Sequence, residues 1–145
     1  MNVQYFVQGN FEKGECQISK FDKGEYMLKI VVGGQIDKDK IKKIVVDFAQ
    51  DKATVDILGD LDAAMAMQNG EYDFYIGACN TGGGGALAMA IAILGLEKCA
   101  TLSMPGKILS DEKMREEVES GKVAFGFTAQ DADNVLSVIL PLIIK

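Results

Sequence analysis

Four consecutive glycines at positions 82–85 separate an apolar segment from one rich in alanine and isoleucine. Residues 72–78 predict a buried strand, and residues 86–94 predict a helix that Gly95 ends. Glycines at such a junction let the backbone approach a ligand closely, and the first N–H groups of the helix then face that ligand at the positive end of the helix dipole. The junction therefore predicts an anion-binding loop, with the thiol of Cys79 at its entrance.

From Met27 onward, short apolar segments alternate with segments of helical periodicity. The pattern predicts strands at residues 28–32, 54–58, 72–78, 99–104 and 123–127. Predicted helices begin near Asp37 and span 61–68, 86–94, 111–120 and 131–144, with Asp60 and Ser110 as caps and Pro141 kinking or shortening the last. Five strands each followed by a helix imply right-handed crossovers and a mainly parallel sheet covered on both faces. We therefore expect one three-layer αβα domain, Rossmann-like or flavodoxin-like, over residues 27–145.

Residues 1–26 carry weak strand patterns and no helical pattern. One hypothesis is a translated leader, because Lys23-Gly24-Glu25 could be encoded by AAAGGAGAA, a ribosome-binding sequence just upstream of Met27. The other is a genuine N-terminal extension that forms a hairpin. N-terminal sequencing of the native protein distinguishes them, since a mature chain that begins at Met1 contradicts the leader hypothesis.

Composition excludes several classes of function. The net charge is −6 and Arg115 is the single arginine, which argues against a nucleic-acid partner. The chain contains no histidine, so Ser-His-Asp triads, Cys-His pairs and histidine metal sites are excluded within one chain. The three cysteines, Cys16, Cys79 and Cys99, include no CxxC pair and are typical of reduced thiols in the cytoplasm. No apolar segment reaches the roughly 20 residues of a membrane span, so we expect a cytoplasmic protein with no membrane partner.

Ligands of open parallel sheets bind beyond the carboxyl ends of the strands, where we expect the loops at 33–35, 79–85, 105–107 and 128–130 to meet. The candidate ligand-binding residues on these loops are Gly34, Gln35, Asn80, Thr81, Gly82, Gly83, Gly84, Gly85, Lys107 and Thr128. Lys107 is the candidate cation opposite a bound anion. Structural explanations remain open: tight helix–strand packing for the glycines, capping for Thr81, a turn for Asn80 and a solvated surface position for Lys107.

Cys79 has two interpretations. A buried cysteine is usually a small hydrophobic residue. A cysteine beside the start of a helix can instead be a reactive thiolate, which would make Cys79 a catalytic residue. Cys99 lies within a predicted strand and is expected in the core.

The segments YIGACNTGGGGALAMAIAILG, KCATLSMPGK and GKVAFGFT resemble the uncharacterised YhfU-like family of bacterial proteins. The resemblance runs from Met27 to the C-terminus. Members of that family tend to be encoded near transporters and enzymes of small-molecule catabolism, which implies a metabolic role in the cytoplasm.

The glycine junction also resembles, more distantly, the type B ribose-5-phosphate isomerases and the galactose-6-phosphate isomerases. The positions that carry this resemblance are Gly70, Glu71, Asp73, Cys79, Thr81, Gly82 and Gly84. It implies that Cys79 is the base that moves a proton between two sugar carbons, that the backbone of residues 81–85 holds the developing oxyanion, and that the protein is a homodimer. The chain departs from those enzymes at Gln35-Ile36, where they carry an Asp-His pair, and in its lack of histidine. The scaffold and the anion loop can therefore be shared without the chemistry.

We expect a protein that binds a small anionic metabolite, a phosphorylated sugar or a carboxylate, at the loop of residues 79–85. One alternative is an isomerase-like enzyme with Cys79 as its proton-transfer base. Another is a non-catalytic subunit or interaction module with the glycine loop at an interface. The sequence identifies no cofactor, and it indicates no metal site.

Overall fold

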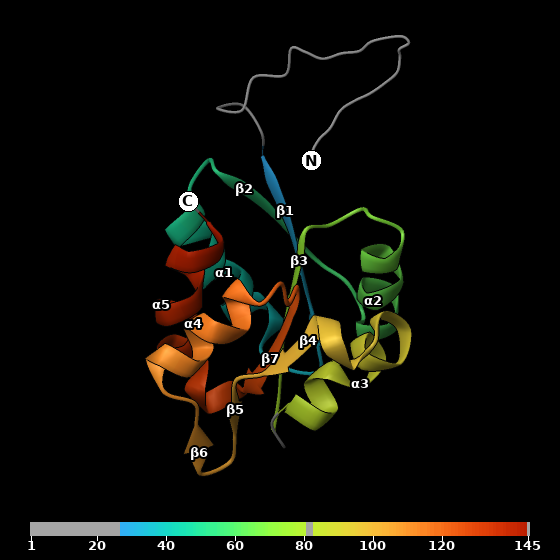
Figure 1. Cartoon of the computed structure of the whole chain (residues 1–145). Helices are drawn as coiled ribbons and strands as arrows, with labels where there is room; N and C mark the ends of the chain where they lie inside the picture. The colour runs from blue at the N-terminus through green and yellow to red at the C-terminus, as the bar shows by residue number, and fades with distance from the viewer. Residues whose placement is uncertain (1–26, 81–82, 145) are drawn as a thin grey trace, which may run out of the picture.

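The computed structural model describes residues 27–80 and 83–144 and shows a three-layer α/β fold (Figure 1). Five parallel strands form one sheet in the order β2-β1-β3-β7-β4. The strands of this sheet are β1 (Leu28–Gly34), β2 (Ala53–Ile57), β3 (Phe74–Cys79), β4 (Cys99–Thr101) and β7 (Ala124–Thr128). The predicted fold class is confirmed.

Helices cover both faces of the sheet. One face carries α1 (Lys38–Ala49), α4 (Asp111–Glu119) and α5 (Ala132–Ile143), and the other carries α2 (Asp60–Gln68) and α3 (Gly83–Leu94) (Figure 1). Two short helices, η2 (Leu96–Lys98) and η3 (Ala129–Asp131), precede β4 and α5. None of the helices within residues 27–80 and 83–144 has the length and apolar character to span a bilayer.

The strand order reverses direction at β1 and β3. The chain leaves β1 through α1 toward β2 at one side of the sheet, and it leaves β3 through α3 toward β4 at the other. Because α1 and α3 lie on opposite faces, their starting turns diverge between the carboxyl ends of β1 and β3. Such a switch point is where open α/β sheets bind ligands.

The side chains of each strand alternate between the two faces. Ile76 and Phe125 belong to the buried cluster under α1 and α5, whereas their strand neighbours Tyr75 and Ala124 belong to the cluster under α2 and α3. Helices bury both faces of the sheet, so successive side chains of a strand are all apolar. This is why the strands appear in the sequence as continuous hydrophobic segments.

Three glycines form a row across the face beneath α3. Gly33, Gly77 and Gly126 are register partners on β1, β3 and β7. A Cβ at Gly126 would lie 2.6 Å from Cγ of Leu87, and a Cβ at Gly33 would lie 2.6 Å from the ring of Tyr75. The row therefore lets both large side chains lie directly on the backbone of the sheet.

The structure differs from the predicted elements in a few places. The predicted strand at 99–104 is two strands, because the Pro105-Gly106 turn folds the chain back so that β5 (Ser103–Met104) pairs antiparallel with β6 (Lys107–Ile108). Gly59, not Asp60, is the N-cap of α2, since Gly59 is extended there and Asp60 already occupies the first turn. Ser110 caps α4 as predicted, accepting a hydrogen bond from the Lys113 N–H at 3.2 Å. Helix α5 continues past Pro141 to Ile143.

Candidate functional site

Three predicted site residues end three neighbouring strands. Gly34, Cys79 and Thr128 are the last residues of β1, β3 and β7. Cys79 is the register partner of Thr128, and Gly34 is the partner of Ala78. The carboxyl edge of the sheet thus brings these three positions together at the switch point.

Thr128 and Cys79 lie beneath the start of α3. Gly126 faces Leu87 of α3, and Thr128 points to the same face about 7 Å nearer the carboxyl edge. The first turn of α3 lies about one helical pitch, roughly 5 Å, before Leu87. The Thr128 hydroxyl and the Cys79 thiol are therefore side by side under the glycines that open the helix.

The polar groups at this edge are buried. Thr128 is 4% exposed, and its Oγ1 has no hydrogen-bond partner among the described residues. Its N–H donates to Oγ of Ser103, which is also buried, at 2.9 Å. In the turn after β7, Oδ2 of Asp131 is likewise buried without a partner in the described part of the chain. Buried polar atoms are nearly always paired in folded proteins, so the Thr128 hydroxyl calls for a partner outside the described residues.

The sequence did not predict Ser103 and Asp131 as residues of this edge. Ser103 falls within the segment predicted as one continuous strand, and its position beside Thr128 depends on the break between β4 and β5. Asp131 was predicted only as the start of the last helix. A serine directly after a strand is the one signal that could have indicated the first of them.

The start of α3 differs from the other helix starts at this edge. Acidic side chains occupy the first turns of α1, α2, α4 and α5, where they complement the helix dipole. The first turn of α3 carries none. Among the five α-helices of the described residues, α3 is thus the one whose positive end has no carboxylate of its own.

The remaining predicted residues lie around this point. The Gln35 N–H donates to the Ala78 carbonyl oxygen at 2.9 Å, while the Gln35 side chain is exposed. Asn80 is exposed directly after β3, and Gly83, Gly84 and Gly85 open α3. Thr81 and Gly82 lie outside the described residues. Lys107 is exposed on β6, in the hairpin that projects from the same edge of the sheet (Figure 1).

Cys79 is fully buried at the end of β3. Burial agrees with the interpretation of Cys79 as a small core residue, and its register partnership with Thr128 leaves the interpretation as a site residue open. Cys99 is also buried, as predicted, and burial raises the pKa of its thiol. In the described part of the chain, no three His, Cys, Asp or Glu side chains form a group that could hold a metal ion.

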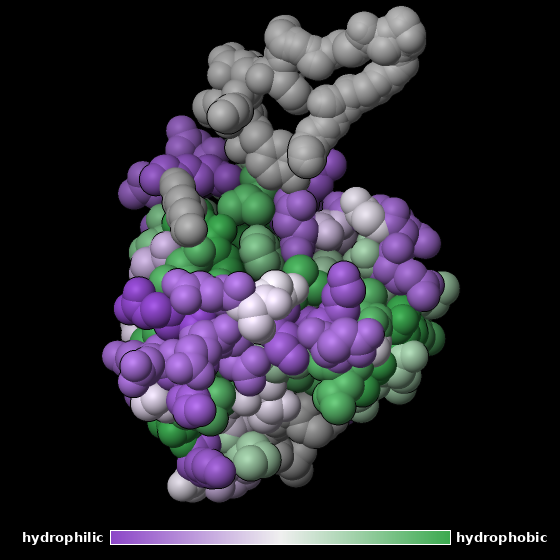
Figure 2. All heavy atoms as spheres, viewed as in Figure 1, coloured by the Kyte–Doolittle hydropathy of each residue, from purple (hydrophilic) through white to green (hydrophobic). Residues whose placement is uncertain are grey.

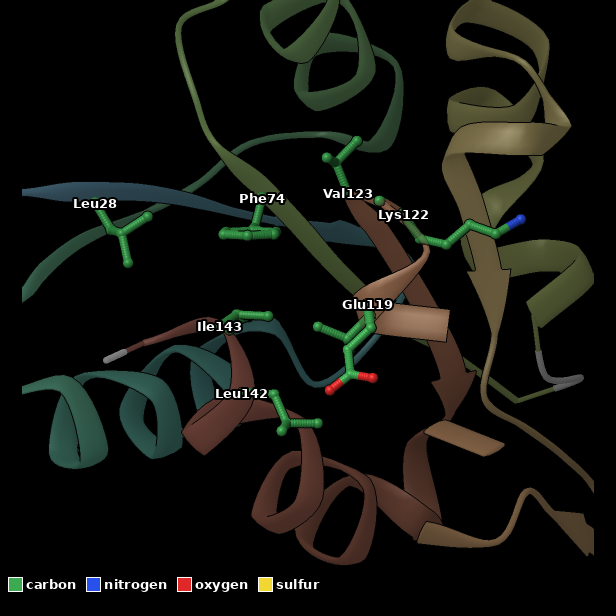
Figure 3. Close-up of a pocket in the computed structure, with 9 residues that line it drawn as sticks. Leu28, Phe74, Glu119, Lys122, Val123, Leu142 and Ile143 are labelled. Carbon is green, nitrogen blue, oxygen red and sulfur yellow. The ribbon is translucent and has the colours of Figure 1, made fainter. Parts of the chain in front are cut away.

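A separate hollow lies at the opposite edge of the sheet. Its volume is about 470 Å³, and Figure 3 shows Leu28, Phe74 and Ile143 lining it where β1 and β3 begin and α5 ends. Glu119 and Lys122, at the end of α4, supply its charged groups. None of the predicted site residues lines this hollow, so it is distinct from the carboxyl-edge site.

The fold is an open, parallel α/β sheet covered by helices on both faces, with a switch point between β1 and β3. Residues 28–143 match the family described as "Protein of unknown function DUF2620". The chain therefore belongs to the DUF2620 family.

Curated relatives agree with this assignment. The chain is 39% identical over 114 residues to "Uncharacterized protein YhfU" of Escherichia coli strain K12, covering 79% of this chain and 97% of the relative. Relatives with the same name in Escherichia coli O6:H1 and Shigella flexneri give the same identity and coverage. The predicted membership of a YhfU-like family is confirmed, while the resemblance to sugar-phosphate isomerases stays a prediction. No solved structure matches the chain.

Proposed function

We propose that this protein binds a small anionic metabolite, a phosphorylated sugar or a carboxylate, in the cytoplasm. The site is the carboxyl edge where β3 ends and α3 begins. The observation that carries the proposal is the buried, unpartnered hydroxyl of Thr128, beside Cys79 and beneath the acid-free start of α3.

An anion at this position satisfies several groups at once. It accepts a hydrogen bond from the Thr128 hydroxyl and from the N–H groups that open α3, at the positive end of the helix dipole. Gly83, Gly84 and Gly85 allow its close approach, and the predicted loop residues Asn80, Thr81 and Gly82 complete the segment between β3 and α3. Gly34 and Gln35 border the site from the end of β1, and Lys107, on the β5–β6 hairpin, is the proposed cation.

A thermal-shift screen tests this proposal with inorganic phosphate, sugar phosphates and small carboxylates. A ligand at about a hundred times its dissociation constant adds roughly 2.7 kcal/mol to the free energy of unfolding. We expect Thr128→Val, which keeps the shape and removes the hydroxyl, to abolish the shift, and Gly83→Val to block the site. The matched control is Thr54→Val on the exposed edge strand β2. A folded protein that no anion stabilises would contradict the proposal.

A catalytic alternative rests on Cys79 being the register partner of Thr128. In that case the Cys79 thiolate moves a proton on a bound carbonyl compound. Cys79→Ser should then keep ligand binding and lose deuterium exchange from solvent into a bound sugar phosphate. Iodoacetamide should alkylate Cys79 at neutral pH and ligand should protect it, whereas a core thiol stays inert until the protein unfolds.

An interaction alternative rests on the character of α3. This helix has no charged side chain, and helices that are apolar all round are normally buried. Its neighbours Leu61, Met65 and Leu96 are 47%, 47% and 68% exposed, and Figure 2 shows apolar side chains at the surface over this part of the molecule. Since the surface of α3 carries no charge, it can meet a second copy without repulsion, which supports a homodimer.

A further inference from the structure

Tyr75 joins the two segments that border the proposed anion site. Its oxygen accepts a hydrogen bond from the Gly34 N–H at 3.0 Å, and its hydroxyl donates to the Ala86 carbonyl oxygen at 2.9 Å. Gly34 ends β1, and Ala86 lies near the start of α3. One phenol oxygen therefore connects the turn after β1 to the opening of the helix, across β3.

The position of this phenol is fixed by packing. Tyr75 is fully buried, and its ring lies on Gly33, where a Cβ would be 2.6 Å from Cε2. Any side chain at Gly33 would therefore displace the ring and its oxygen. Burial also raises the pKa of Tyr75 to about 12, so the hydroxyl keeps the proton that it donates to Ala86.

We propose that Tyr75 is a positioning residue of the anion site, and that its hydroxyl holds the Gly34 turn and the first turn of α3 in register. The inference rests on the proposed function for the ligand and on the two hydrogen bonds for the linkage. An anion at the start of α3 touches groups from both segments only when their separation is fixed. Tyr75→Phe keeps the packing of the ring on Gly33 and removes both hydrogen bonds. Any change in ligand affinity in this variant is therefore due to the loss of the hydroxyl.

The test compares Tyr75→Phe with Tyr72→Phe in the full chain. Tyr72 is a matched control because its hydroxyl donates to Asp56 at 2.8 Å, near the surface and away from this edge. Three quantities are measured: hydrogen exchange at the Gly34 amide, the dissociation constant of inorganic phosphate, and the Cζ resonances of ¹³C-labelled tyrosine. In Tyr75→Phe we expect Gly34 exchange to quicken about tenfold and the phosphate dissociation constant to rise about tenfold. Phosphate should shift the Tyr75 resonance in the unsubstituted protein, and Tyr72→Phe should leave exchange and affinity unchanged.

Three other results would contradict, in turn, the linkage of the two segments, the positioning role of Tyr75 and the anion site. Unchanged Gly34 exchange in Tyr75→Phe overturns the linkage of the two segments. Faster exchange with an unchanged phosphate affinity overturns the positioning role. Faster exchange in a protein that binds no phosphate supports the linkage and counts against the proposed anion site instead.

Discussion

Strands β1 and β3 approach so closely at Gly34 that only glycine fits there. Gly34 has a φ of +79°, and a Cβ there would lie 2.6 Å from the Ala78 nitrogen. Backbone atoms cannot move aside as a flexible side chain can, so two separate effects require glycine at this position. Gly34 therefore contributes both to the stability of the sheet and to the shape of the candidate site.

Comparing Gly34→Ala with Gly70→Ala separates the cost of a positive φ from the cost of the clash with the Ala78 backbone. We expect Gly34→Ala to lower the free energy of unfolding by roughly 3 kcal/mol or more, since strain and a backbone clash add. Gly70→Ala is the matched control, because Gly70 has a φ of +80° with no atom within 4 Å of a Cβ, and it should cost about 1 kcal/mol. Urea unfolding of both variants measures the difference. Equal losses would mean that the contact with Ala78 is relieved by a shift of the strand.

The buried phenol of Tyr75 gives stability a dependence on alkaline pH. Its pKa is about 12 in the folded chain and 10 ordinarily, with desolvation as the main cause. The protonated form therefore stabilises the fold fully below pH 10, and this contribution, about 3 kcal/mol, is lost as the pH rises from 10 through 12. Tyr72 also has a pKa of about 12, chiefly through its hydrogen bond to Asp56, so it should ionise late too.

Unfolding measured between pH 9 and about pH 12 checks this, with Tyr75→Phe as the comparison. The variant should lose less stability over that interval than the unsubstituted chain. Identical pH profiles would show that the Tyr75 hydroxyl ionises at the same pH in the folded and unfolded chains.

The sequence predicted Cys79 and Thr128 as site residues, but it did not predict that they are register partners on neighbouring strands. Both follow apolar strands, which is visible in the sequence, whereas their register partnership depends on how β3 and β7 pair. The two strands are separated by 44 residues between the end of β3 and the start of β7. Pairing over that separation is decided by packing of whole layers, so local periodicity does not contain it.

At the scale of elements, caps and turns set the boundaries. The predicted Ser110 cap is confirmed, since the Ser110 side chain accepts a hydrogen bond from the Lys113 N–H. Asp60 was wrong as a cap because the chain turns one residue earlier, at Gly59. The β5–β6 hairpin was missed because Pro105-Gly106 was interpreted as the end of a strand and not as a reversal.

The Ser110 cap should have a measurable value. Ser110→Ala removes the acceptor of the Lys113 N–H and should lower the free energy of unfolding by about 1 kcal/mol. Ser137→Ala is the control, since Ser137 is exposed on α5 and donates to Asn134 within its own helix. It should change stability by less than about 0.5 kcal/mol. Equal effects in thermal unfolding would count against a capping role.

At the scale of the molecule, the alternation of strands and helices was enough to predict three layers. It was not enough to predict strand order, because β7 could have joined the outside of β4 without any change in the pattern. The order instead follows from which helices share a face. That order is what places Thr128 beside Cys79.

The apolar surface over α2 and α3 predicts self-association. We expect a dimer in light scattering with size-exclusion chromatography, and we expect Met65→Glu to convert it to a monomer by placing like charges against each other. Met104→Glu on the hairpin is the control, since Met104 has a similar exposure of 44% and lies elsewhere. A protein that is monomeric at all concentrations would contradict the interaction alternative.

The position of β7 also governs how this chain can be made. β7 is the last strand of this sheet in sequence. It lies inside the sheet, however, and pairs with β3 on one side and β4 on the other. A nascent chain that has left the ribosome only as far as α4 holds β4 without its neighbour in the sheet, and the carboxyl-edge site lacks Thr128. Such non-local closure slows folding. The sheet can therefore close only after β7 has been synthesised, and a truncation that removes Ala124–Thr128 should leave a chain that aggregates.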